Sequence, residues 1–89
     1  MAEVECWTVA TGNVSLLRKA SRQAAKYIAN LEGFVGVHID PQGRGTVWLF
    51  NSENNAKKAR NLMQGKGIKC GTNICQVFVD ESYLMKGKK

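Results

Sequence analysis

Residues 34–51, with the sequence FVGVHIDPQGRGTVWLFN, contain two apolar runs separated by a turn-forming segment. The runs at residues 34–40 and 45–51 are rich in β-branched and aromatic side chains, which favour strands. Pro41 and Gly43 lie between the runs, and both residue types favour tight turns. We therefore predict that the two runs are neighbouring antiparallel strands of one hairpin.

Helical patterns lie on both sides of this hairpin. Between Val14 and Leu31 apolar residues recur at steps of three and four, which predicts an amphipathic helix over residues 13–32. Ser52 is a candidate N-cap for a second helix over residues 52–65. The apolar stripe of that second helix consists of Ala56, Ala59, Leu62 and Met63.

Strand patterns at residues 4–10 and 74–80 begin and end the series, and a tail of residues 81–89 follows. The resulting order, βαββαβ, is typical of an α+β ferredoxin-like two-layer sandwich. We predict a four-stranded antiparallel sheet of order 4-1-3-2 with two helices on one face. A chain of 89 residues should form this as a single domain.

The composition excludes several classes of protein. Apolar residues make up 44% of the chain and charged residues 22%, as in ordinary folded domains. No apolar run approaches the roughly 20 residues of a membrane-spanning helix, and the N-terminus does not resemble a secretory signal. Three cysteines are an odd number for a disulfide framework. We expect a cytoplasmic protein with reduced thiols and no membrane contact.

No motif for catalysis or metal binding is present. His38 has no recognisable nucleophile or carboxylate partner, so we expect it to be structural or simply exposed. Cys70 and Cys75, with the single histidine, provide too few ligands for a closed zinc site. We therefore predict that the protein is not an enzyme and needs no cofactor.

Charge favours an anionic partner. Thirteen lysines and arginines stand against seven acids, which gives a net charge of +6. A small basic domain is biased toward polyanions such as nucleic acids, although a merely solvated surface gives the same balance.

Alternation along the strands predicts which side chains leave the helix-covered face. We expect Val47 and Leu49 to face the helices, because two large aromatic rings would be crowded beneath helices lined by alanine. The same alternation sends Cys6, Thr8, Val35, Val37, Ile39, Cys75, Val77 and Val79 toward the helices. The open face would then carry Trp7, Trp48, Phe50 and Phe78, with His38 and Gln76 at its sides.

The segment RGTVWL at residues 44–49, with Trp7 on the first strand, resembles the signature of the RNA-recognition motif family. The passage from the second helix to the last strand is also similar to that family. The resemblance implies that Trp7 and Trp48 would stack on bases and that Arg44 would contact phosphate.

We predict a small non-catalytic binding module for single-stranded RNA or DNA, since aromatic platforms edged by cations bind single strands. The basic rim would consist of Arg44, Lys66, Lys69 and the C-terminal lysines. The alternative is a protein-interaction or homodimerising accessory or inhibitor domain that uses the same sheet face. The tail at residues 83–85 could also cover the aromatic side chains.

Overall fold

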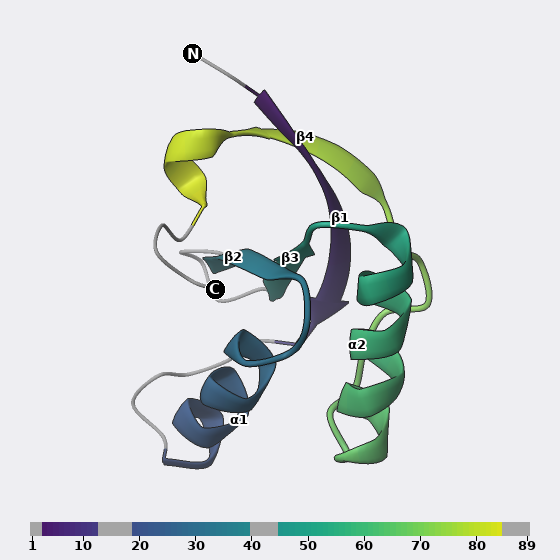
Figure 1. The fold of residues 1–89 in the computed structure, drawn as a ribbon. Helices are drawn as coiled ribbons and strands as arrows, with labels where there is room; N and C mark the ends of the chain where they lie inside the picture. The colour runs from purple at the N-terminus through teal and green to yellow at the C-terminus, as the bar shows by residue number, and fades with distance from the viewer. Residues whose placement is uncertain (1–2, 13–18, 40–44, 85–89) are drawn as a thin grey trace.

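The computed structural model describes residues 3–12, 19–39 and 45–84, and it confirms the predicted βαββαβ order (Figure 1). A short 3-10 helix, η1, follows the last strand. The elements span Glu3–Thr11 (β1), Lys19–Ala29 (α1), Phe34–Ile39 (β2), Thr46–Phe50 (β3), Glu53–Gly65 (α2), Gln76–Asp80 (β4) and Glu81–Tyr83 (η1).

Helix α1 ends earlier than the predicted end at residue 32. Its last residue is Ala29, after which the Leu31 N–H donates to the Ile28 carbonyl at 3.1 Å in a turn. Gly33 completes this turn with a φ of 84°, a left-handed conformation that glycine adopts readily because it has no Cβ. The predicted start of the helix, at residue 13, lies outside the described residues.

Helix α2 begins and ends as predicted. Ser52 is its N-cap, and the Ser52 Oγ accepts a hydrogen bond from the Asn55 N–H at 3.1 Å. After Gly65, the Lys66 N–H donates to the carbonyls of Leu62 and Met63 at 3.2 and 3.0 Å. Both ends of the helix therefore satisfy backbone groups that helix termini leave free.

The four strands form one antiparallel sheet in the order β2-β3-β1-β4. This is the predicted order read from the opposite edge. The hairpin of β2 and β3 is also confirmed, and an irregularity in its register lies between Phe34 and Gly36. Beyond it, Val37 lies opposite Trp48 and His38 lies opposite Val47.

The main core lies between the sheet and the two helices. The ring centroid of Phe34 is 6.3 Å from that of Trp48 and 6.0 Å from that of Phe50, within the usual range of favourable aromatic pairs. The sheet supplies the large aromatic rings, and α2 supplies Ala56 and Ala59, which are small, together with the larger Met63. The buried cluster consists of Val9, Ile28, Phe34, Trp48, Phe50, Ala56, Ala59 and Met63.

The predicted orientation of β1 and β3 is wrong. Trp48 and Phe50 are 2% and 0% exposed and pack against helix residues, and Trp7 packs against the same cluster. Their alternating neighbours, Thr8 and Leu49, therefore point away from the helices. The alanines of α2 do not crowd the rings. Their small size leaves a space that only large side chains fill to normal packing density.

The orientation of β4 is corrected in the same way, whereas on β2 the prediction is supported at Val37 only, because the irregularity between Phe34 and Gly36 also brings Phe34 into the helix-side cluster and Ile39 is 36% exposed. Val77 lies opposite Cys6 in the β1–β4 ladder, on the face that alternates with Trp7, so Val77 points away from the helices. On β2, Val37 packs against the helix-side cluster as predicted.

No helix in the described ranges is long and apolar enough to cross a membrane.

Candidate ligand-binding face

The face of the sheet away from the helices is aliphatic. We call it the open sheet face and define it by Thr8, Val47, Leu49, Val77 and Val79. Three strands contribute to it, because β1 pairs with both β3 and β4. Thr8 lies directly opposite Leu49, which places these two side chains together on the same face.

A hollow of about 400 Å³ lies over the open sheet face. A volume of this size falls within the range of ligand-binding clefts. All five residues of the open sheet face line it, together with Val37, His38, Phe78 and Asp80. The walls are therefore mainly aliphatic, with an imidazole and a carboxylate at the margin.

The chain bends back toward this face after β4. Figure 1 shows η1 on the opposite side of the sheet from both helices. Two hydrogen bonds stabilise the bend. At its start, Asp80 Oδ1 accepts from the Ser82 N–H at 2.9 Å. At its end, the Leu84 N–H donates to the Glu81 carbonyl at 3.1 Å. The first of these bonds holds the carboxylate of Asp80, which is a lining residue of the hollow.

Thr8 holds β1 and the segment before β4 together at the hollow. The Thr8 N–H donates to the Cys75 carbonyl at 2.9 Å, and Thr8 Oγ1 accepts from the Cys75 N–H at 3.1 Å. The hydroxyl is therefore satisfied within the sheet, which leaves the methyl group as its contribution to the lining.

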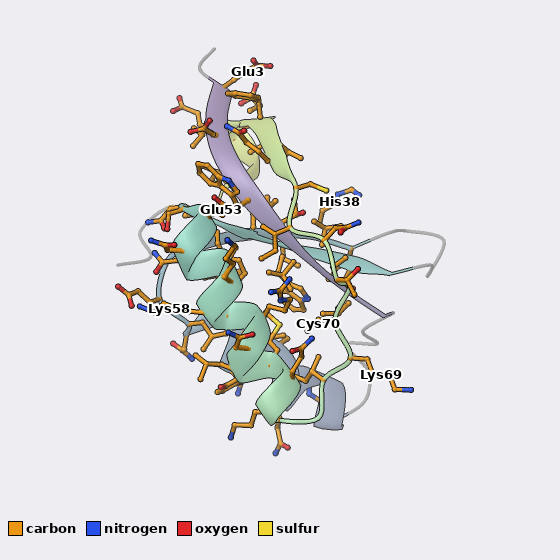
Figure 2. The ribbon with its side chains drawn as sticks, turned by 90° about the vertical axis from the view of Figure 1, so that its right-hand side faces the viewer. Glu3, His38, Glu53, Lys58, Lys69 and Cys70 are labelled. Atoms are coloured by element: carbon orange, nitrogen blue, oxygen red, sulfur yellow. The ribbon has the colours of Figure 1, made fainter. Side chains whose placement is uncertain are left out.

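Acidic side chains gather at the end of the sheet where β1 begins and β4 ends. Glu3 lies opposite Asp80 in the ladder, and Glu81 follows directly. Glu5 accepts a hydrogen bond from the Gln76 amide nearby. Figure 2 shows Glu3 at the end of the molecule opposite to Lys58 and Lys69. Glu3 and Glu5 alternate with Val4 and Cys6, so they lie on the face of Trp7, and Asp80 is the described acid that lines the hollow itself.

Basic side chains lie on the helix layer of the molecule. Every lysine and arginine that the structure describes lies on α1, on α2 or in the connection that follows α2. Two of them are paired with acids: Lys57 Nζ lies 3.6 Å from Glu53 Oε2, and Lys58 Nζ lies 3.4 Å from Glu32 Oε1. The two ends of the molecule thus carry opposite charge.

The predicted aromatic platform is not assembled. Trp48 is buried and its Nε1 donates to Thr11 Oγ1 at 3.0 Å, while Phe50 is fully buried. Trp7 is half-buried on the helix side. Phe78 is 61% exposed and is the one member of the predicted set whose ring is largely open to solvent.

The polar residues of the predicted site are also dispersed. His38 is exposed and borders the hollow. Lys66 and Lys69 are exposed in the connection after α2, and Figure 2 shows Lys69 pointing away from the body of the molecule, far from Glu3. Arg44 lies outside the described residues.

The three cysteines are free thiols with different surroundings. Cys6 is fully buried, and burial together with the nearby Glu5 carboxylate raises the pKa of its thiol. Burial also raises the pKa of the Cys70 thiol, against a smaller lowering effect of Arg60. Cys75 is exposed. Raised pKa values keep Cys6 and Cys70 protonated, and therefore poorly reactive, at neutral pH.

Sequence reasoning missed the valines and Leu49 as lining residues, because it placed them in the helix-side core. A volume argument would have found them. An alanine-lined helix needs large side chains beneath it, and on β3 those are Trp48 and Phe50. Once these rings face α2, alternation sends Val47 and Leu49 to the open sheet face.

Comparisons with protein-family models, with curated proteins and with solved structures gave no match to this chain.

Proposed function

We propose that the protein is a small non-catalytic binding module whose open sheet face holds an apolar segment of a protein partner. The observation that carries this proposal is the aliphatic hollow of about 400 Å³ on the sheet face that neither helix covers. Leu49 is buried, but Thr8, Val47, Val77 and Val79 are half-buried, and exposed apolar surface typically marks a contact site because leaving it in water is unfavourable.

Charge at the hollow specifies the chemistry of that partner. Asp80 lines the hollow, and Glu3 and Glu81 lie at the same end of the sheet. No lysine or arginine of the described residues lines it. The complementary ligand is therefore a segment with apolar side chains beside a lysine or arginine, which would pair with the acidic end.

We also propose that the fold is ferredoxin-like and that the protein is cytoplasmic. The βαββαβ order, with residues of both helices in one cluster against one sheet face, supports a ferredoxin-like sandwich. The three free thiols support a reducing compartment such as the cytoplasm.

Single-stranded RNA or DNA is the second candidate ligand, by a different surface from the one the sequence suggests. With Trp48 and Phe50 buried, base stacking on the sheet has little support. The observation in favour of nucleic acid is the concentration of described cations on the helix layer, since phosphate contacts dominate binding to nucleic acids. The resemblance to the RNA-recognition motif stays a prediction.

The experiment is a titration of the protein into a labelled peptide in which leucine and valine alternate with serine before two lysines. We expect saturable binding, weaker binding of a peptide ending in two glutamates, and loss of binding in Val77→Lys, which puts a charge on the open sheet face. Leu62→Lys is the matched control, because Leu62 is 51% exposed on α2. It adds the same charge on the other layer and should bind normally.

Asp80→Asn tests whether the negative charge at the hollow selects a peptide that carries lysines. Asparagine keeps the side-chain oxygen that accepts from the Ser82 N–H but removes the charge, so preference for the lysine peptide should fall while folding persists. Equal binding of both peptides by the original protein would refute the charge argument. A dimer in light scattering that Val77→Lys dissociates would replace the peptide proposal with self-association.

A further inference from the structure

A second hollow, of about 260 Å³, lies on the helix layer. Gln23, Ala24 and Tyr27 of α1 form one wall, and Lys66 and Ile68 of the connection after α2 form the other. This volume is below the roughly 300–1,000 Å³ of typical small-molecule pockets. It suits a compact group of a larger ligand better than a whole small molecule.

Lys66 holds a positive charge in a fixed place at this hollow. Its ammonium nitrogen lies 4.8 Å from the centroid of the Tyr27 ring, in a cation–π contact. Its backbone is fixed by hydrogen bonds to Leu62 and Met63 at the end of α2. An ammonium group has three N–H donors, so contact with the ring leaves donors for an anion. Because the side chain is already positioned, an anion pays little ordering entropy to bind it.

Two further cations are sequence neighbours of residues that line the hollow. Lys26 is the neighbour of Tyr27 on α1, and Lys69 follows Ile68. In the part of the chain that the structure describes, Lys26, Lys66 and Lys69 have no acidic partner, unlike Lys57 and Lys58. Their charge is therefore available to a ligand.

We propose that this hollow binds the phosphodiester backbone of a single-stranded nucleic acid. Lys66 contacts one phosphate inside the hollow, and Lys26 and Lys69 contact neighbouring phosphates on either side. Tyr27 is a positioning residue that holds Lys66. A single strand can bend its backbone into such a hollow, whereas a duplex would have to be deformed. The site does not depend on the proposed peptide contact at the open sheet face.

The test is fluorescence anisotropy with a labelled oligothymidylate of about 16 nucleotides, at salt concentrations between about 50 and 200 mM. Lys66→Gln should weaken binding by about three- to tenfold and reduce the slope of log affinity against log salt by about 0.7. The triple change of Lys26, Lys66 and Lys69 to glutamine should nearly abolish binding. Val77→Lys should not weaken it.

Matched control variants distinguish binding at this hollow from a general attraction to the positive charge of the protein. Lys57→Gln removes the same charge from a lysine paired with Glu53, so it should weaken binding much less than Lys66→Gln. Tyr27→Phe keeps the ring and should bind normally, whereas Tyr27→Leu should reproduce the loss in Lys66→Gln. Equal losses in Lys57→Gln and Lys66→Gln would overturn the site.

The nature of the anion is tested by competition. Inorganic phosphate at the same phosphate concentration should displace the oligonucleotide poorly, because it cannot span several lysines. Displacement of the single strand by inorganic phosphate, or stronger binding of a duplex of equal length, would overturn the assignment to single-stranded nucleic acid. Loss of this binding would leave the peptide contact at the open sheet face intact.

Discussion

Trp48 and Phe50 show how residue volume determines which face of a strand is buried. Both rings lie in the cluster that includes Ala56 and Ala59 of α2, whose side chains are single methyl groups. Protein interiors are packed like organic crystals, so the space left beside these two methyl groups has to be filled by large side chains of the sheet. The indole N–H of Trp48 is also satisfied by Thr11, which removes the cost of burying it.

Trp48→Ala should therefore destabilise the fold, contrary to an exposed stacking role. Removing a buried ring of this size costs about 3–5 kcal/mol of unfolding free energy, measured by urea denaturation. Phe78→Ala is the control, because Phe78 is 61% exposed and its truncation should cost much less. A stable Trp48→Ala protein would show that the indole does not support the core.

The buried thiols predict a loss of stability at alkaline pH. Burial raises the pKa values of Cys6 and Cys70 above their ordinary value of 9.0. Between the unfolded and the folded pKa the unfolded chain has fewer bound protons, so deprotonation favours unfolding and stability falls as pH rises. The contribution is fully present below about pH 9 and is lost above it.

The measurement is the free energy of unfolding between neutral pH and the alkaline range, under reducing conditions. Cys70→Ala should flatten the decline, since it removes one of the two titrating groups. Cys75→Ala is the matched control, because it makes the same change at an exposed cysteine. A slope that is identical in all three proteins would assign the alkaline transition to other groups.

At the scale of elements, α2 depends on its first turn. Ser52 has an extended backbone, with φ of −154° and ψ of 158°, and its hydroxyl accepts from the Asn55 N–H. Glu53 follows in the first turn, where a negative charge interacts favourably with the helix dipole. The same turn meets the α1–β2 connection, since the Asn51 N–H donates to the Gly33 carbonyl at 2.8 Å. The start of α2 is therefore tied to another element.

Ser52→Ala should lower the unfolding free energy by about 1 kcal/mol, because it leaves the Asn55 N–H without its acceptor. Thermal or urea unfolding monitored by circular dichroism measures the loss. Ser52→Asp should retain most of the stability, since aspartate is an equally good N-cap. If alanine and aspartate behaved alike, the hydroxyl would contribute nothing to the helix.

At the scale of the whole molecule, charge is separated between the two ends. Glu3, Glu5, Asp80 and Glu81 lie where β1 begins and β4 ends, and the described cations lie on the helix layer. The Debye length is about 10 Å at 0.1 M salt, and the molecule extends 24 Å or more along each principal axis, so charges at opposite ends are largely screened from one another. Each end therefore presents its own charge to a ligand.

Because of this separation, we expect that removing two acids from one end of the molecule changes binding to a cation exchanger more than removing two acids from the other end. Glu32→Gln with Glu53→Gln removes two acids beside Lys58 and Lys57, so the protein should elute from a cation exchanger at higher salt. Glu3→Gln with Glu81→Gln changes the net charge equally but lies at the other end, so elution should shift much less. Equal shifts would mean that net charge alone governs binding.

The sequence alone determined the elements and their pairing. Apolar spacing predicted both helices, and the β-branched runs around Pro41 predicted the β2–β3 hairpin, because these signals depend on neighbours close in the chain. The end of α1 was less well predicted, since the turn before Gly33 already begins after Ala29.

Only the tertiary structure decided which side of the sheet meets the helices, and with it the candidate site. Alternation divides each strand into two sets of side chains but does not say which set is covered. On β3 both sets are apolar, so hydrophobicity could not choose between Trp48 and Leu49. The choice depends on the volume that α1 and α2 leave above the sheet, a quantity that exists only when the two layers pack together.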